Sequence, residues 1–229
     1  MIDLGHRGYS AKYPENTMEA FKQAYFKGFD GIETDVQMTK DGVLVLIHDE
    51  KINRTSTGKG YVKDYTFKQL REFNFHNQYQ GFYMIPSLQE LLTFIKGKDF
   101  IVNLEIKTDV IEYPDIERKV VKMVHEMGVE KQVLYSSFHL ASVLRLKELD
   151  PLSHVGYLME VQYQKKRNEL LENHITAFHP RYNYLNEKTV LDLKQNHIII
   201  ATWTVPSFRE YQRLKRLGVD IIISNEYFK

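Results

Sequence analysis

The sequence of 229 residues contains no cysteine. Disulfides, thiolate zinc sites and a cysteine nucleophile are therefore excluded, and any metal ligands must be oxygen atoms or imidazole nitrogens. A net charge of one sign is also nearly absent, because 31 basic residues against 30 acidic ones leave a formal charge of +1. This balance disfavours nucleic-acid binding, and an anionic partner would have to be bound by local charges.

Long hydrophobic runs are absent too. The chain has no stretch of about 18 apolar residues, the length that a membrane-spanning helix requires. Candidate functional residues begin at His6, which leaves no room for the parts of a signal peptide before them. We therefore expect a cytoplasmic protein without stable membrane association. The sequence leaves the oligomeric state open.

Short β-branched segments alternate with longer segments of helical period along the chain. The expected strands are Ile2–Gly5, Gly31–Val36, Val43–Ile47, Ile101–Ile106, Gln132–Ser136, His154–Leu158, Thr176–Phe178, Ile198–Thr202 and Asp220–Ile223. The expected helices are Thr17–Lys27, Ser87–Ile95, Asp115–Met127, Leu140–Glu148, Lys166–Asn173, Glu187–Gln195 and Ser207–Leu217. This alternation favours a parallel sheet, and about eight strands in a chain of this length favour an α/β fold of the (β/α)₈ TIM-barrel type. We expect one domain over residues 1–229.

The third expected strand does not fit a regular barrel. Only the tight turn Lys40-Asp41-Gly42 separates it from the second strand, which is too short for a crossover helix, so one strand must be extra or antiparallel. Residues 51–86 lack a clear period and are expected to form an insertion packed at the barrel mouth, either a lid or an ordinary connection. At the first helix, Asn16 is expected to act as the N-cap, with Glu19 completing a capping box.

Two carboxylates in the second strand suggest a metal site. Residues two apart in a strand point to the same side, so Glu33 and Asp35 project together. Buried side by side they would repel, and a divalent cation is the simplest remedy; oxygen ligands suit Mg²⁺ or Ca²⁺. Glu105 would complete the ligand set, and Lys107 would meet an anionic substrate. The alternative is a buried Glu105–Lys107 ion pair without a metal.

Two histidines follow strands at the carboxyl ends, where barrel enzymes keep their chemistry. His6 and His48 would divide the roles of general base and general acid between them. Arg7 offers the planar fork that binds phosphate through two hydrogen bonds. Phe138 and Trp203 also follow strands and are expected to form an aromatic wall that contacts substrate. A cation, two imidazoles and an arginine suit phosphoryl transfer.

Other enzyme classes lack support in the sequence. It has no P-loop, no dinucleotide-binding fingerprint and no Gly-x-Ser-x-Gly elbow. Of the remaining histidines, His179 is the one whose strand-end position would bring it to the same mouth.

The chain resembles the glycerophosphodiester phosphodiesterase family, and the likeness extends from the N-terminus to about Trp203. The motifs that carry it, in order, are His6-Arg7-Gly8, Pro14-Glu15-Asn16-Thr17, Glu33-Thr34-Asp35-Val36, Thr39-Lys40-Asp41-Gly42, His48-Asp49, Arg54-Thr55, Ile85-Pro86-Ser87-Leu88, Glu105-Ile106-Lys107 and Ser136-Ser137-Phe138.

The resemblance implies a TIM barrel with an insertion after the third strand, and hydrolysis of glycerophosphodiesters such as glycerophosphocholine or glycerophosphoethanolamine to glycerol 3-phosphate and an alcohol. By the same resemblance, the two catalytic histidines are His6 and His48, acting as general base and acid. The residues that would hold one Mg²⁺ or Ca²⁺ ion are Glu33, Asp35 and Glu105. The residues that would neutralise the phosphate are Arg7 and Lys107.

The chain departs from the family pattern at two places. Pro206 follows Trp203-Thr204-Val205 where the family commonly has asparagine, and Ser224-Asn225 replaces a common Thr-Asp pair. We expect neither departure to touch the catalytic residues, and both to bear on substrate preference.

Three alternatives remain beside the family's reaction. The same barrel would suit a phosphodiesterase acting on phosphoinositides or a lysophospholipid. A catalytically silent protein that senses glycerophosphodiesters would be expected to lose a histidine or a carboxylate, and none is missing. A barrel isomerase using Glu105 as its base would leave the paired histidines unexplained.

Overall fold

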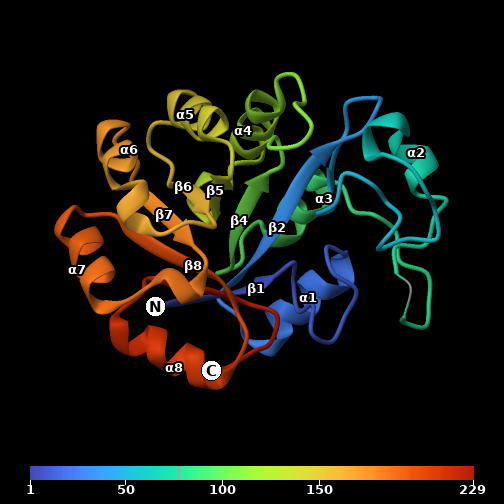
Figure 1. Cartoon of the computed structure of the whole chain (residues 1–229). Coiled ribbons are helices and arrows are strands. Elements are labelled where there is room, and N and C mark those ends of the chain that lie inside the picture. Colours follow the sequence, from blue (N-terminus) through green and yellow to red (C-terminus); the bar gives the residue numbers. More distant parts are fainter. Residues whose placement is uncertain (77) are drawn as a thin grey trace.

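The computed structural model describes residues 1–76 and 78–229, and within them eight parallel strands close into a barrel (Figure 1). They are β1 (Ile2–His6), β2 (Gly31–Met38), β4 (Ile101–Ile106), β5 (Val133–Ser137), β6 (Val155–Met159), β7 (Ala177–Pro180), β8 (Ile199–Val205) and β9 (Ile221–Ser224). β1 closes the barrel by pairing with both β2 and β9. The predicted (β/α)₈ barrel is confirmed.

Helices surround the barrel and alternate with its strands (Figure 1). They are α1 (Met18–Lys27), α3 (Leu88–Ile95), α4 (Ile116–Met127), α5 (Leu140–Leu149), α6 (Arg167–Glu172), α7 (Glu187–Gln195) and α8 (Phe208–Leu217), with 3₁₀ turns at Glu130–Gln132, Tyr163–Lys165 and Tyr182–Tyr184. The main apolar core lies between these helices and the outer faces of the strands, whereas a small second cluster fills the barrel interior around Leu4, Ala201 and Ile223. Within the described ranges, no helix is long and apolar enough to cross a membrane.

The extra strand is β3 (Leu44–Leu46), and it is antiparallel to β2. Gly42 takes a φ of +82° in the turn between them, a conformation that glycine adopts without strain. The backbone N–H of Ile47 donates to the carbonyl of Asp35 at 3.0 Å. The hairpin therefore brings His48 back beside the end of β2.

The insertion at residues 51–86 contains a 3₁₀ turn (Val62–Asp64) and the short helix α2 (Phe67–Leu70). Its apolar side chains form a cluster of their own with Val45 and Ile47, separate from the barrel core. The insertion thus packs on β3 and lies to one side of the ring of helices (Figure 1).

The start of α1 differs from the prediction. Its N-cap is Thr17, whose hydroxyl accepts a hydrogen bond from the backbone N–H of Ala20. Asn16 instead takes a φ of +54°, and its side chain donates to Asp35 at 2.9 Å and accepts from Thr34 at 2.7 Å. The expectation that Asn16 caps the helix was wrong, because its amide is used to hold a buried carboxylate.

Candidate active site

The carboxyl ends of the barrel strands surround a cavity of about 420 Å³. This volume is in the usual range for small-molecule sites. Seven of the nine predicted site residues line it: His6, Arg7, Glu33, His48, Glu105, Phe138 and Trp203. The other two contact this group, since Asp35 lies 3.5 Å from Arg7 and Lys107 lies 3.1 Å from Glu105.

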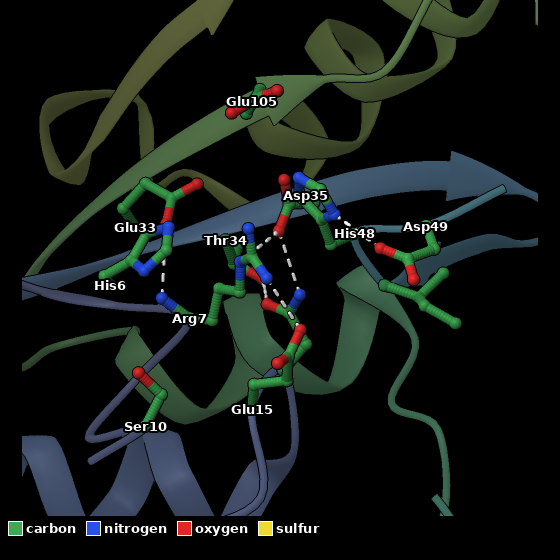
Figure 2. Close-up of polar contacts among 12 residues, drawn as sticks. His6, Arg7, Ser10, Glu15, Glu33, Thr34, Asp35, His48, Asp49 and Glu105 are labelled. Atoms are coloured by element: carbon green, nitrogen blue, oxygen red, sulfur yellow. Dashed lines mark hydrogen bonds and ion pairs between the residues drawn. The ribbon is translucent and has the colours of Figure 1, made fainter. Parts of the chain in front are cut away.

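The three predicted metal ligands converge, as Figure 2 shows. One carboxylate oxygen from each of Glu33, Asp35 and Glu105 lies within 4.8 Å of the others. The strand register produces this arrangement, because Asp35 of β2 pairs directly with Glu105 of β4. Oδ1 of Asp35 is buried and has no hydrogen-bond partner in the described part of the chain. A buried, unpartnered oxygen among three carboxylates fits a divalent cation.

The electrostatics of the three carboxyls agree with this fit. Burial and the neighbouring carboxylates raise the pKa of Glu33 well above its ordinary value. Burial and Asp35 likewise raise the pKa of Glu105 to about 7. Burial also disfavours the charged form of Asp35, but the charges of Arg7, His48 and Lys107 and the hydrogen bond from Asn16 together outweigh burial and lower the pKa of Asp35. Keeping all three groups charged at neutral pH therefore requires further positive charge.

Lys107 forms the ion pair with Glu105 that the sequence left open as an alternative. Its Nζ lies 3.1 Å from Oε1 of Glu105 and 3.9 Å from Asp109. The charge of Lys107 also lowers the pKa of Asp35, but the pKa of Glu33 on the same strand stays well above its ordinary value. The structure therefore contains both the Glu105–Lys107 ion pair and the cluster of three carboxylates.

Arg7 lies between the carboxylates and the loop that precedes α1. It takes a φ of +54°, and its backbone N–H donates to Oε2 of Glu33 at 3.2 Å. Its guanidinium binds Glu15 at 2.8 Å and lies 3.5 Å from Asp35. The next residue is Gly8, at φ +82°, where a Cβ atom would approach the backbone of Ala20 to 2.7 Å, so a glycine is required for this turn.

His6 lies at the end of β1. Its Nδ1 is 2.6 Å from Oδ1 of Asn225, and its Nε2 is 3.9 Å from Oε2 of Glu33. Burial and the charge of Arg7 lower the pKa of His6 to about 4. Because Asn225 contacts His6, the expectation that the departure at position 225 does not touch the proposed catalytic residues was wrong. Pro206, the other departure, is not among the described residues that line the cavity.

His48 has a different partner. Its Nδ1 lies 2.6 Å from Oδ1 of Asp49, and this hydrogen bond, with those from Arg54, lowers the pKa of Asp49. Arg54 binds Asp49 at 2.7 and 2.9 Å and Glu15 at 2.8 Å through two nitrogens. Because Glu15 also binds Arg7, a continuous chain of ion pairs connects the insertion to the acidic cluster.

Aromatic side chains form another wall of the cavity. The rings of Phe138 and Trp203 meet edge to face, with centroids 5.4 Å apart. Nε1 of Trp203 donates to the carbonyl of His179 at 2.8 Å. The imidazole of His179 does not itself line the cavity. It is 3% exposed and packs against Gly156, and its Nδ1 lacks a hydrogen-bond partner within residues 1–76 and 78–229.

A model of the glycerophosphoryl diester phosphodiesterase family matches residues 6–227. The chain belongs to this family. A glycerophosphodiester phosphodiesterase from Caldanaerobacter subterraneus subsp. tengcongensis is 38% identical over 97% of this chain and 93% of its own length. The crystal structure of a family enzyme from Thermotoga maritima has a TM-score of 0.81 at 30% identity and covers 99% of this chain and 95% of its own. An Oleispira antarctica phosphodiesterase, solved in complex with the product sn-glycerol-3-phosphate, has the same fold, with a TM-score of 0.85, 23% identity and coverage of 98% and 93%.

Several residues around the cavity were not predicted from the sequence. Asn103 lies opposite Glu33 in the strand register, and its alternation with Glu105 was a signal that could have found it. Asp109 and Glu160 line the cavity from segments after β4 and β6, and no motif marked them.

Proposed function

We propose that the protein hydrolyses glycerophosphodiesters, such as glycerophosphocholine or glycerophosphoethanolamine, to glycerol 3-phosphate and an alcohol, and that residues 1–229 act as one domain. The observation that carries this proposal is the presence of two imidazoles and three converging carboxylates in one cavity. The names of the relatives and the product bound to the Oleispira antarctica enzyme support it.

Glu33, Asp35 and Glu105 would hold one divalent cation, Mg²⁺ or Ca²⁺, for which oxygen ligands are typical. When bound, such an ion withdraws negative charge from phosphate oxygens. Arg7 and Lys107 add positive charge beside the same carboxylates and would bind the non-bridging oxygens of the phosphate. Phe138 and Trp203 would pack against the organic part of the substrate.

The surroundings of the two histidines support separate roles. His6 is neutral at physiological pH because its pKa is lowered, so it would act as the general base and take a proton from the nucleophile, which we assign to the 2-hydroxyl of glycerol. His48 would act as the general acid and protonate the leaving alcohol, and the carboxylate of Asp49 would stabilise its charged form. Attack of the 2-hydroxyl on phosphorus would break the bond to the alcohol and leave a cyclic phosphate. Water would then open this cyclic phosphate, with the two histidines exchanging roles.

We further propose that the enzyme works in the cytoplasm without stable membrane association. The formal charge of +1 supports a small-molecule substrate and gives no general attraction to nucleic acid.

The test is the release of glycerol 3-phosphate from glycerophosphocholine by the purified protein, first with EDTA and then with Mg²⁺ or Ca²⁺ restored. We expect release that depends on the cation, and a loss of about 10²- to 10⁴-fold in kcat for His6→Gln and for His48→Gln. His154→Gln, at an exposed histidine before β6, is the matched control and should retain full activity. Unchanged activity in either catalytic variant, or no release with any cation, would contradict the proposal.

A further inference from the structure

A short hydrogen bond joins two residues from opposite ends of the sequence. Nδ1 of His6 lies 2.6 Å from Oδ1 of Asn225. An amide oxygen has no proton to donate, so Nδ1 must carry the hydrogen, and in the neutral imidazole Nε2 then carries the lone pair. Nε2 is the nitrogen on the side of Glu33, 3.9 Å from its Oε2. The ring nitrogen that faces the acidic cluster is therefore the one able to accept a proton.

Asn225 is itself held in place by two further hydrogen bonds. The hydroxyl of Ser10 donates to the same Oδ1 at 3.1 Å, and the backbone N–H of Ala11 donates to the carbonyl of Asn225 at 3.1 Å. Asn225 directly follows β9, which pairs with β1, the strand that ends at His6. The pairing of these two strands thus places the amide oxygen of Asn225 beside Nδ1 of His6.

The two histidines of the site have orienting partners of different charge. Figure 2 shows them on opposite sides of the acidic cluster, with Asp49 beside His48 and Ser10 on the side of His6. The partner of His48 is a carboxylate, whereas that of His6 is an amide. Asparagine keeps the acceptor oxygen in place and adds no charge.

We propose that Asn225 is a positioning residue, which fixes the proton of His6 on Nδ1 and so presents the lone pair of Nε2 to the substrate. This inference rests on the proposed role of His6 as the general base. Asn225 is not among the described residues that line the cavity, so it acts through the imidazole. In serine proteases, losing the group that holds a catalytic imidazole in the correct tautomer lowers kcat by as much as about 10⁴-fold.

The first experiment measures the tautomer directly and does not depend on activity. Two-bond ¹H–¹⁵N spectra of protein labelled at histidine distinguish a proton on Nδ1 from one on Nε2, and the signals of His6 are assigned from their loss in His6→Gln. We expect the Nδ1–H form in the wild-type protein and a shift toward the Nε2–H form in Asn225→Leu. The signals of His48 should not change, because it does not contact Asn225.

The second experiment is kinetic. Asn225→Leu should lower kcat by about 10²-fold or more with little change in KM, because the base loses its orientation while the substrate contacts remain. Asn225→Asp should restore most of kcat, since a carboxylate accepts the same hydrogen bond. Glu226→Gln is the matched control: this neighbouring side chain binds Tyr9 at 2.6 Å instead of His6, and its variant should match the wild type in both experiments.

The outcomes separate this inference from the proposed function. A wild-type protein that does not hydrolyse glycerophosphodiesters refutes the proposed function, and the spectra still decide whether Asn225 sets the tautomer. Hydrolysis by a protein whose His6 carries its proton on Nε2 overturns the inference alone. So does an Asn225→Leu variant that retains both the Nδ1–H form and the wild-type kcat.

Discussion

Gly156 and His179 occupy neighbouring strands in the barrel interior and are in unusually close contact. A Cβ atom added at Gly156 would lie 2.2 Å from Nε2 of His179 and 2.4 and 2.5 Å from two of its carbons. These three atoms form the outer end of the imidazole, so the clash is relieved only if the whole ring rotates away. His179 is only 3% exposed, so the ring has little free space into which it can rotate. We predict that Gly156→Ala destabilises the protein.

The expected magnitude follows from two opposing effects. Inserting a methyl group into a packed core costs about 1–3 kcal/mol. Replacing glycine by alanine also reduces the entropy of the unfolded chain, which stabilises by about 0.4–1 kcal/mol. The free energy of unfolding should therefore fall by about 1–2 kcal/mol. For a chain of this length, that corresponds to a decrease of roughly 2–8 °C in Tm.

Urea unfolding followed by circular dichroism measures this change. The matched control is the same Gly156→Ala substitution in a His179→Ala background, where the ring is absent and the added methyl group fills part of the space that it leaves. We expect the cost of Gly156→Ala to disappear there, with a coupling energy of about 1 kcal/mol or more. A variant as stable as wild type, or an equal cost in both backgrounds, would refute the reasoning.

Three further predictions concern the pH dependence of stability, the binding of the divalent cation and the proposed general acid, His48. Burial lowers the pKa of His179 from 6.5 to about 4, so between pH 6.5 and 4 this histidine is protonated in the unfolded chain but not in the folded protein. The free energy of unfolding should therefore fall when the pH is lowered from about 6.5 to 4. Urea unfolding at several pH values should show a slope that is smaller in His179→Ala than in wild type, by up to about 1.4 kcal/mol per pH unit. Glu33→Gln should raise Tm in the absence of metal, because it removes repulsion between like charges. The same variant should bind Mg²⁺ or Ca²⁺ about tenfold or more weakly in calorimetry. Unchanged affinity would exclude Glu33 as a ligand. Asp49→Asn should lower kcat by about 10- to 100-fold with KM little changed, because the charged form of His48 loses its carboxylate, and steady-state kinetics that show no loss would contradict this.

Local sequence patterns predicted the barrel well because each strand carries its own signal. Buried β-branched segments gave the strands, and the short turn at Lys40-Asp41-Gly42 correctly indicated a strand that could not join the barrel in parallel. The alternation of side chains in a strand likewise placed Glu33 and Asp35 on one face, and the structure brings them together with Glu105.

Contacts that depend on the path of the chain were not predictable in this way. Asparagine is a favoured N-cap residue, but the side chain of Asn16 donates its hydrogen bond to the carboxylate of Asp35 on β2 instead. Asn225 contacts His6 across 219 positions, through a register between β1 and β9 that no local pattern encodes. Arg54 belongs to a motif that was recognised in the sequence. Its ion pairs with Glu15 and Asp49 could not be predicted, because they depend on the path of the insertion.

The pairing of β1 with β9 has a consequence for the order in which the protein matures. The ribosome makes β1 first, and β1 then has only β2 as a neighbour until residues 221–225 have emerged. Domains generally fold as units, and this barrel cannot close until β9 is present to pair with β1. A nascent chain that already contains both histidines and all three carboxylates would still lack the partner of His6. The surroundings of His6 are therefore complete only after β9 has been synthesised and has paired with β1.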